Sequence, residues 1–143
     1  MTSQICVDAS FAVKLVLPEA DSHSARYLWA SWSDHEIRVI APCHLMFEVV
    51  SVIRNHVLRK EIGPEDGQRA LEAFLAQDIE RIHPSGFEGR AWELAQRFDR
   101  PTAYDAYYLA VAEAAGCDLW TADSRLYRAV HDSLEWVKLL GVP

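Results

Sequence analysis

The chain has 143 residues, the size of a single domain that can bury a proper hydrophobic core. Half of the residues are hydrophobic, 24% are charged and the net charge is −7, which argues against a protein that coats nucleic acid through a wide basic surface. No apolar run approaches the ~18–20 residues of a membrane span, and the amino-terminal segment lacks the basic start and long apolar region of a signal peptide, so we expect a cytoplasmic protein.

The predicted elements alternate short strands with longer helices. Strands are expected at residues 4–8, 37–42, 118–123 and 134–140, and residues 79–84 form either a short strand or an extended link. Helices are expected at residues 22–34, 43–61, 63–77, 86–98, 102–116 and 124–130. No linker or repeat interrupts this order, so residues 1–143 are expected to form one domain. Its predicted fold class is α/β, a three-layer α/β/α sandwich with a mostly parallel central sheet.

Apolar positions predict how several of these residues are buried. The helix at 43–61 is apolar over most of its circumference through residue 53, so we expect it to be largely enclosed. The helix at 86–98 is amphipathic, with four apolar residues: Phe87, Trp92, Leu94 and Phe98. The cysteines are odd in number and widely separated, so buried reduced thiols are expected rather than a disulfide framework or a zinc site: Cys6, Cys43 and Cys117.

The segment HLMFEVVSVIRN, residues 44–55, places one carboxylate among seven large apolar residues. At ~100° per residue, four side chains share one narrow polar stripe of the predicted helix: His44, Glu48, Ser51 and Asn55. That stripe faces either solvent or an internal cleft. Glu48 is therefore either an exposed carboxylate or a functional one.

Three further acids stand at the ends of predicted elements. Asp8 ends the first strand, and Asp123 lies just past the strand at 118–123. Each is also a candidate cap for the helix that follows it. Asp105 lies near the start of the helix at 102–116, third after Thr102 in a capping-box spacing, although its face of that helix is apolar and looks inward.

Taken together, the four acids are placed to converge on one crevice, because ligands of parallel α/β sheets bind beyond the carboxyl ends of the strands. Like charges at such close range are unfavourable unless a cation lies among them. Carboxylate oxygens suit a hard ion, Mg²⁺ or Mn²⁺, and such an ion supports the hydrolysis of a phosphodiester. In that arrangement Glu48 is a metal ligand or orients the attacking water.

Three segments in this order resemble the PIN-domain family, and in particular the VapC-type toxins of bacterial toxin–antitoxin pairs. They are VDASFAVKLVLPEADSHSARYL, FEVVSVIR and TAYDAYYLAVAEAAGCDLWTADSRLYRAV. The block YDAYYLAVA…TAD is the most specific of them, and the likeness runs from about residue 4 to the end of the chain.

The resemblance implies a PIN-like fold and a Mg²⁺- or Mn²⁺-dependent endoribonuclease. The family's four catalytic and metal-binding acids correspond by position to Asp8, Glu48, Asp105 and Asp123. The supporting side chains that correspond by position are Ser10, Thr121 and Ser51. Many family members have Asn where this chain has Ser51, which puts one supporting hydrogen bond in doubt but not the metal.

The resemblance also implies partners. Family members are usually homodimers, held inactive by a small antitoxin that wraps over the toxin and can direct a basic side chain at the acidic pocket. The substrate that the resemblance implies is RNA, and the better candidates to contact it are Arg125 and Arg128, next to Asp123. Weaker candidates are Lys14, Arg54 and Arg59.

Two competing functions remain open. An aspartyl-phosphate phosphatase of the haloacid dehalogenase type also begins with Asp at a strand end, but it needs a second acid two residues later, where this chain has Ser10. A PIN-like binding module with a degraded site is the non-enzymatic alternative, and the presence of all four acids argues against it. No glycine-rich nucleotide-binding loop occurs in the sequence.

Overall fold

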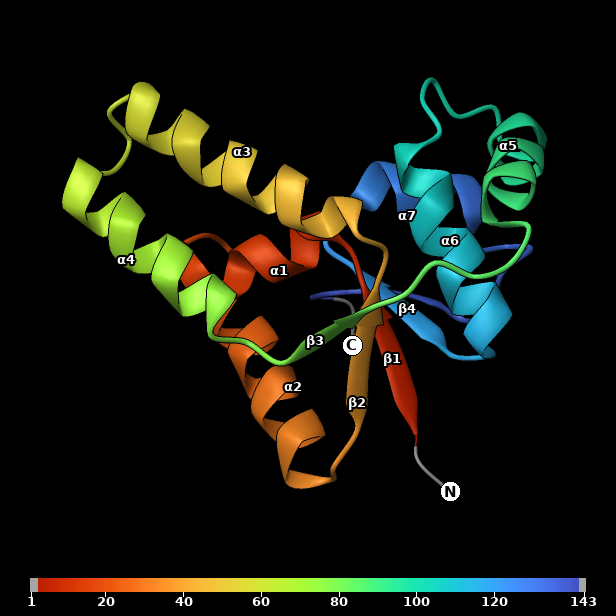
Figure 1. Cartoon of the computed structure of the whole chain (residues 1–143), viewed down its shortest axis with the longest axis horizontal. Helices are drawn as coiled ribbons and strands as arrows, with labels where there is room; N and C mark the ends of the chain where they lie inside the picture. Colours follow the sequence, from red (N-terminus) through yellow and green to blue (C-terminus); the bar gives the residue numbers. More distant parts are fainter. Residues whose placement is uncertain (1–2, 142–143) are drawn as a thin grey trace.

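The computed structural model describes residues 3–141, which form one five-stranded sheet between helices (Figure 1). The strands are β1 (Gln4–Val7), β2 (Arg38–Ala41), β3 (Ile79–Arg81), β4 (Asp118–Thr121) and β5 (Val137–Leu139). Their order is β3-β2-β1-β4-β5, and every neighbouring pair is parallel. The predicted α/β fold with a mostly parallel sheet is thus confirmed, and residues 79–81 form a strand rather than a link.

The helices are α1 (Ala9–Val16), α2 (Ser22–Asp34), α3 (His44–Leu58), α4 (Pro64–Leu75), α5 (Phe87–Arg97), α6 (Tyr104–Ala115) and α7 (Ser124–Val130). The ranges predicted for α2 and α7 agree with the structure residue for residue. Helices α3, α4, α5 and α6 are each one to three residues shorter at either end than predicted. Gly116 ends α6 with a positive φ of 65°, a conformation that glycine adopts without steric cost. None of the helices described here is long and apolar enough to cross a membrane.

Successive side chains of a strand point to opposite faces of the sheet, and a different layer of helices covers each face. Val7 and Val39 face Phe11 of α1 and Trp32 of α2. The neighbouring residues of the same strands, such as Cys6, face α6 on the other side. In Figure 1 the sheet accordingly lies between α1 and α2 on one side and α5, α6 and α7 on the other.

Helices α3 and α4 pack side by side and extend away from the sheet (Figure 1). A Cβ at Gly67 of α4 would come within 2.4 Å of the Val57 side chain, so only glycine fits there unless Val57 or its helix shifts. Leu45, Val49 and Ile53 make one buried stripe of α3.

The expectation that α3 is largely enclosed is wrong. Phe47 is 73% exposed, and Val50 and Leu58 are also exposed. The physical reason is that α3 projects beyond the sheet, so that most of its covered residues face α1 and α4.

Two smaller burial predictions also need correction. Cys6 is buried, but Cys117 is only partly buried and Cys43, just before α3, is exposed. All three thiols are free, and burial raises the pKa of the Cys6 thiol. Trp92 lies on the outer side of α5 and is exposed, because Ala91, Leu94 and Ala95 form the buried side of that helix.

Candidate active site

Asp8 is the most buried of the four predicted site acids, with 5% of its surface exposed. It follows β1 directly and caps α1, because its Oδ1 accepts a hydrogen bond from the Phe11 backbone N–H at 3.0 Å. Ser10 donates to the same oxygen at 2.7 Å, and the Thr121 hydroxyl donates to Oδ2. The cap expected as an alternative role is therefore present, and both oxygens also face hydroxyl groups of the site.

Ser10 and Thr121 join the carboxyl ends of the two central strands. Their hydroxyl oxygens are 3.2 Å apart, and the Ala122 backbone N–H donates to Ser10 Oγ at 2.9 Å. Thr121 Oγ1 also accepts from the Asp123 backbone N–H at 3.0 Å. These bonds fix Asp8 against β4 across 113 residues of sequence.

The charge of Asp8 is poorly compensated. Burial raises the pKa of its carboxyl from 3.8 to about 6, against the hydrogen bonds from Thr121, Ser10 and Phe11, which favour the ionised form. The negative charge of Asp105 raises it further. The hydroxyl and amide donors therefore offset the cost of burying this carboxylate only in part.

Glu48 projects from α3 toward α6. Its Oε1 accepts a hydrogen bond from the Tyr108 hydroxyl at 3.0 Å and lies 3.0 Å from His44 Nε2. Tyr108 is fully buried, and its pKa is raised by burial and by the charge of Glu48, so the phenol remains a donor. The polar stripe of α3 thus meets another helix at Glu48, whereas Ser51 on the same stripe is exposed.

Asp105 lies in the first turn of α6, and its Oδ2 is 3.1 Å from Arg100 Nη2. The capping box expected with Thr102 is wrong: the helix begins at Tyr104, and Ala103 precedes it without a side-chain cap. The reason is that the chain between residues 100 and 103 turns so that a cation, Arg100, meets the carboxylate. No local sequence signal indicated Arg100.

Arg100 is itself enclosed, with 13% of its side chain exposed. Within residues 3–141 its Nε is buried and has no hydrogen-bond acceptor. A buried donor without a partner is costly, so this arrangement needs a physical explanation.

Asp123 caps α7, as its alternative role predicted. Its Oδ1 accepts from the backbone N–H groups of Arg125 at 2.9 Å and of Leu126 at 3.3 Å. The side chains of Arg125 and Arg128 are exposed on α7, and Lys14 is partly buried near the end of α1. These positions allow, but do not test, the roles that the sequence predicts for them.

The donor set fits a hard divalent ion in its chemistry. Asp8, Glu48 and Asp105 offer carboxylate oxygens from three elements that meet around the carboxyl end of β1, and the raised pKa of Asp8 indicates a place where added positive charge is favourable. In the part of the chain described, no three His, Cys, Asp or Glu side chains are grouped closely enough to hold an ion as they stand. The predicted four-acid metal site therefore stays a prediction.

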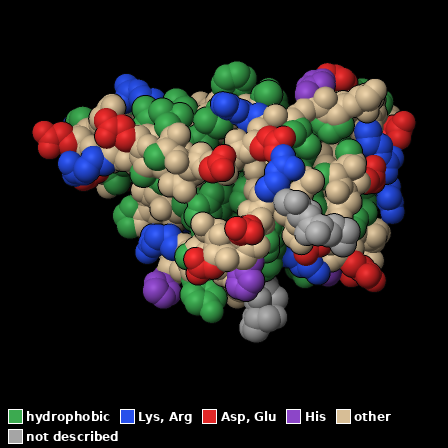
Figure 2. Space-filling view, turned by 60° about the horizontal axis from the view of Figure 1, so that its bottom comes forward, with side chains coloured by type: hydrophobic (Ala, Val, Ile, Leu, Met, Phe, Trp, Pro, Cys, Tyr) green, Lys and Arg blue, Asp and Glu red, His purple; other side chains and the backbone are tan. Residues whose placement is uncertain are grey.

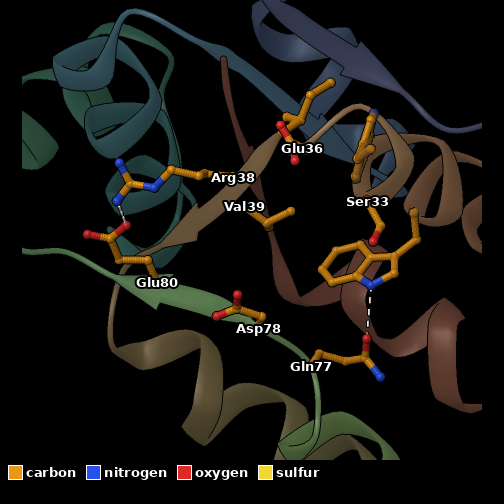
Figure 3. Close-up of a pocket in the computed structure, with 10 residues that line it drawn as sticks. Ser33, Glu36, Arg38, Val39, Gln77, Asp78 and Glu80 are labelled. Carbon is orange, nitrogen blue, oxygen red and sulfur yellow. Dashed lines mark hydrogen bonds and ion pairs between the residues drawn. The ribbon is translucent and has the colours of Figure 1, made fainter. Parts of the chain in front are cut away.

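A separate hollow of about 360 Å³ lies at the opposite end of the sheet, at the amino ends of β2 and β3 (Figure 3). Its lining includes Trp29, Arg38, Asp78 and Glu80, and none of the four predicted site acids. Arg38 pairs with Glu80 there, and the indole N–H of Trp29 donates to Gln77 at 2.9 Å. Four of its polar side chains are thus paired with one another.

Known proteins share both the sequence and the fold. Residues 5–131 match the family model described as PIN domain. Ribonuclease VapC9 of Mycobacterium tuberculosis is 36% identical over 122 residues, which cover 85% of this chain and 87% of that protein. Ribonuclease VapC12 of the same organism is 35% identical over 123 residues, which cover 85% and 88%.

The fold recurs in the crystal structure of VapC20 of Mycobacterium tuberculosis, a toxin that cleaves the sarcin–ricin loop. The TM-score is 0.65 at 24% identity, with 88% of this chain and 95% of that chain covered. This likeness concerns the fold, while the family rests on the model match and the closer sequences. The chain therefore belongs to the PIN domain family, alongside the VapC ribonucleases.

Proposed function

We propose that this protein is a Mg²⁺- or Mn²⁺-dependent endoribonuclease, the toxin of a toxin–antitoxin pair. The observation that carries the proposal is Asp8, a carboxylate buried at the carboxyl end of β1. It is held by two hydroxyls and one backbone N–H, with no cation among these donors, and the charge of Asp105 raises its pKa. The position is the one where parallel α/β sheets bind ligands. The VapC ribonucleases that share about a third of the sequence support the choice of RNA as substrate.

Each site residue has a task in this proposal. Asp8, Glu48 and Asp105 would hold the ion, with Asp123 as a further ligand that also caps α7. A bound ion would stabilise negative charge at the phosphorus and help to ready a water molecule for attack.

Two hydroxyls keep the Asp8 carboxylate in place for that task. Ser10 engages Oδ1 and Thr121 engages Oδ2, so that the plane of the carboxylate is set from both sides. The donors are side chains of α1 and β4, two elements that pack against each other. Their role is to orient Asp8, and neither needs to touch RNA.

Cations on the two helices that Asp8 and Asp123 cap offer contacts for the RNA backbone. Arg125 and Arg128 lie on α7 directly after Asp123, and Lys14 lies on α1 after Asp8. Phosphate contacts by Arg and Lys position nucleic acid without reading its sequence. A local group of this kind is compatible with a net charge of −7.

Protein partners are part of the same proposal. The exposed apolar residues of α3, Phe47, Val50 and Leu58, support a surface that is covered in an assembly, either in a homodimer or by a small antitoxin. The acidic charge of the chain favours a basic antitoxin segment.

The test is cleavage of RNA by the purified protein with Mg²⁺ or Mn²⁺, with EDTA and with Asp8→Asn as controls. Sequencing the cleaved ends after induced expression identifies the target. We expect cleavage that stops in EDTA and is lost in the variant. RNA binding without cleavage by the wild type would favour the binding module instead, and cleavage by Asp8→Asn at the wild-type rate would contradict the site.

A further inference from the structure

We propose that His44 is a positioning residue of the active site, which sets Glu48 in place relative to the helix that carries Asp105. The inference rests on the proposed function, because it concerns the same acids. Its basis is that Nε2 of His44 lies within hydrogen-bond distance of a side chain of α3 and of the backbone of α6.

His44 Nε2 lies 3.0 Å from Glu48 Oε1 and 3.2 Å from the backbone carbonyl oxygen of Tyr104. Both neighbours are acceptors, so the tautomer that fits this geometry carries its hydrogen on Nε2 and shares it between them. Tyr104 is the residue directly before Asp105. One N–H group therefore links the Glu48 carboxylate to the backbone next to Asp105, across 60 residues of sequence.

The ring of His44 is held by aromatic neighbours, which fix the direction of that N–H. Its centroid lies 4.6 Å from the Tyr108 ring and 5.4 Å from the Tyr107 ring, and 18% of the side chain is exposed. Both tyrosines belong to α6. The imidazole therefore packs on α6, and the first turn of the same helix accepts its hydrogen bond.

Tyr108 completes the arrangement from the other side. Its hydroxyl donates to Glu48 Oε1, the same oxygen that His44 approaches. With two donors converging on Oε1, Oε2 is the oxygen available to a cation. Glu48 is a long side chain on the partly exposed polar stripe of α3, so without these donors it would sample several rotamers. We infer that His44 keeps the carboxylate in the one rotamer that faces the site.

Two substitutions separate the hydrogen bond from the packing. His44→Phe keeps an aromatic ring against the tyrosines of α6 and removes the N–H. His44→Gln removes the ring and keeps an amide N–H of similar reach. If His44 acts as a positioning residue, His44→Gln stays closer to wild type, and if it only fills space, His44→Phe does.

The first readout is the dissociation constant of Mn²⁺ for the full chain without RNA, measured from the electron paramagnetic resonance signal of free Mn²⁺. Partners that orient metal ligands typically contribute about 10- to 100-fold in metal affinity. We expect the dissociation constant to rise about 10-fold in His44→Phe and less in His44→Gln. The second readout is RNA cleavage, where we expect kcat to fall in the same order and KM for RNA to stay unchanged, because His44 contacts Glu48 rather than RNA.

A double variant tests whether His44 acts through Glu48. In a Glu48→Ala background, His44→Phe should add no further loss of Mn²⁺ affinity, and an additive loss would overturn the proposal. Circular dichroism and the metal-free melting temperature check that each variant is folded.

The outcomes distinguish the two proposals. A wild type that binds Mn²⁺ but leaves RNA intact contradicts the ribonuclease, while the order of the variants in Mn²⁺ affinity still decides the role of His44. An active wild type with His44→Phe equal to it, or better than His44→Gln, overturns the positioning role alone. A wild type that binds no Mn²⁺ overturns both.

Discussion

The two ends of the sheet differ in how their charges are neutralised. At the amino ends of β2 and β3, Arg38 pairs with Glu80, and Trp29 bonds Gln77 across a hollow (Figure 3). At the carboxyl ends of β1 and β4, Asp8 is almost fully buried, and its described hydrogen-bond donors are hydroxyls and a backbone amide. On the side of the molecule that is turned forward in Figure 2, acidic and basic side chains are interspersed, so charges of opposite sign lie near one another there. In the proposed function, the active site therefore lies where a buried charge is incompletely neutralised, and not at the hollow.

The largest expected effect follows from removing charge at the carboxyl end. Asp8→Asn and Asp105→Asn should each lower kcat/KM for RNA by more than about 100-fold, because a metal ion contributes several kcal/mol to the transition state. The matched control is Asp78→Asn at the hollow, which is exposed and should leave activity unchanged. A loss of activity in Asp78→Asn as large as in the other two variants would contradict the difference between the two ends of the sheet.

The next effect is stabilisation by metal. At a concentration of Mn²⁺ near 100 times its dissociation constant, the wild type should gain about 2.7 kcal/mol in free energy of unfolding. Asp8→Asn and Asp105→Asn should gain much less, and Asp78→Asn as much as the wild type. Thermal melts with and without Mn²⁺ measure this, and identical shifts in all four proteins would place the ion elsewhere.

Removing the charge of Asp8 should also stabilise the metal-free protein. Its pKa is raised from 3.8 to about 6, so the ionised carboxylate lowers the free energy of unfolding fully above about pH 6, and this penalty shrinks as the pH falls toward 3.8. Asp8→Asn should therefore gain about 1–3 kcal/mol at pH 7 and progressively less below pH 6. Urea unfolding of the wild type and Asp8→Asn in EDTA, at pH 7 and at pH 5, measures this gain in free energy of unfolding. A larger gain at pH 5 than at pH 7 would contradict a raised pKa of Asp8.

The smallest effect compares one arginine at each end. Arg100→Gln leaves the partly buried Asp105 without its cation, and we expect the metal-free protein to lose about 1 kcal/mol in free energy of unfolding. The loss is this small because burying the Arg100 Nε without an acceptor already offsets part of what the ion pair contributes. Arg38→Gln removes an ion pair that is half exposed and should cost less than about 0.5 kcal/mol. Urea midpoints in EDTA decide this, and the reverse order would contradict the difference between the two ends.

Local patterns predicted the fold well. Helical spacing placed α2 and α7 correctly, and the strand ends at Asp8 and Asp123 were located together with the caps that these residues provide. The resemblance to the PIN-domain family, with its VapC-type members, is confirmed by the comparisons. These successes share a cause, since period, caps and strand ends are all written in neighbouring residues.

Contacts between segments that are far apart in the sequence could not be predicted from neighbouring residues. The apolar circumference of α3 suggested enclosure, but burial depends on how far the helix extends past the sheet, so Phe47 is exposed. Thr102 had the spacing of a capping box, yet Asp105 pairs with Arg100 because of how the preceding loop turns. The bond from His44 to the Tyr104 carbonyl depends on two helices meeting, which no periodicity encodes.

The close approach of Gly67 to Val57 has a mechanical consequence. Because the two helices touch with no room for a methyl group, a larger residue at position 67 would displace the Val57 side chain or push α3 away from α4. Glu48 lies near the beginning of α3, and Val57 and Leu58 lie at its end. A methyl group at position 67 would therefore disturb the last turn of α3, where Val57 lies, rather than the first turns that carry Glu48.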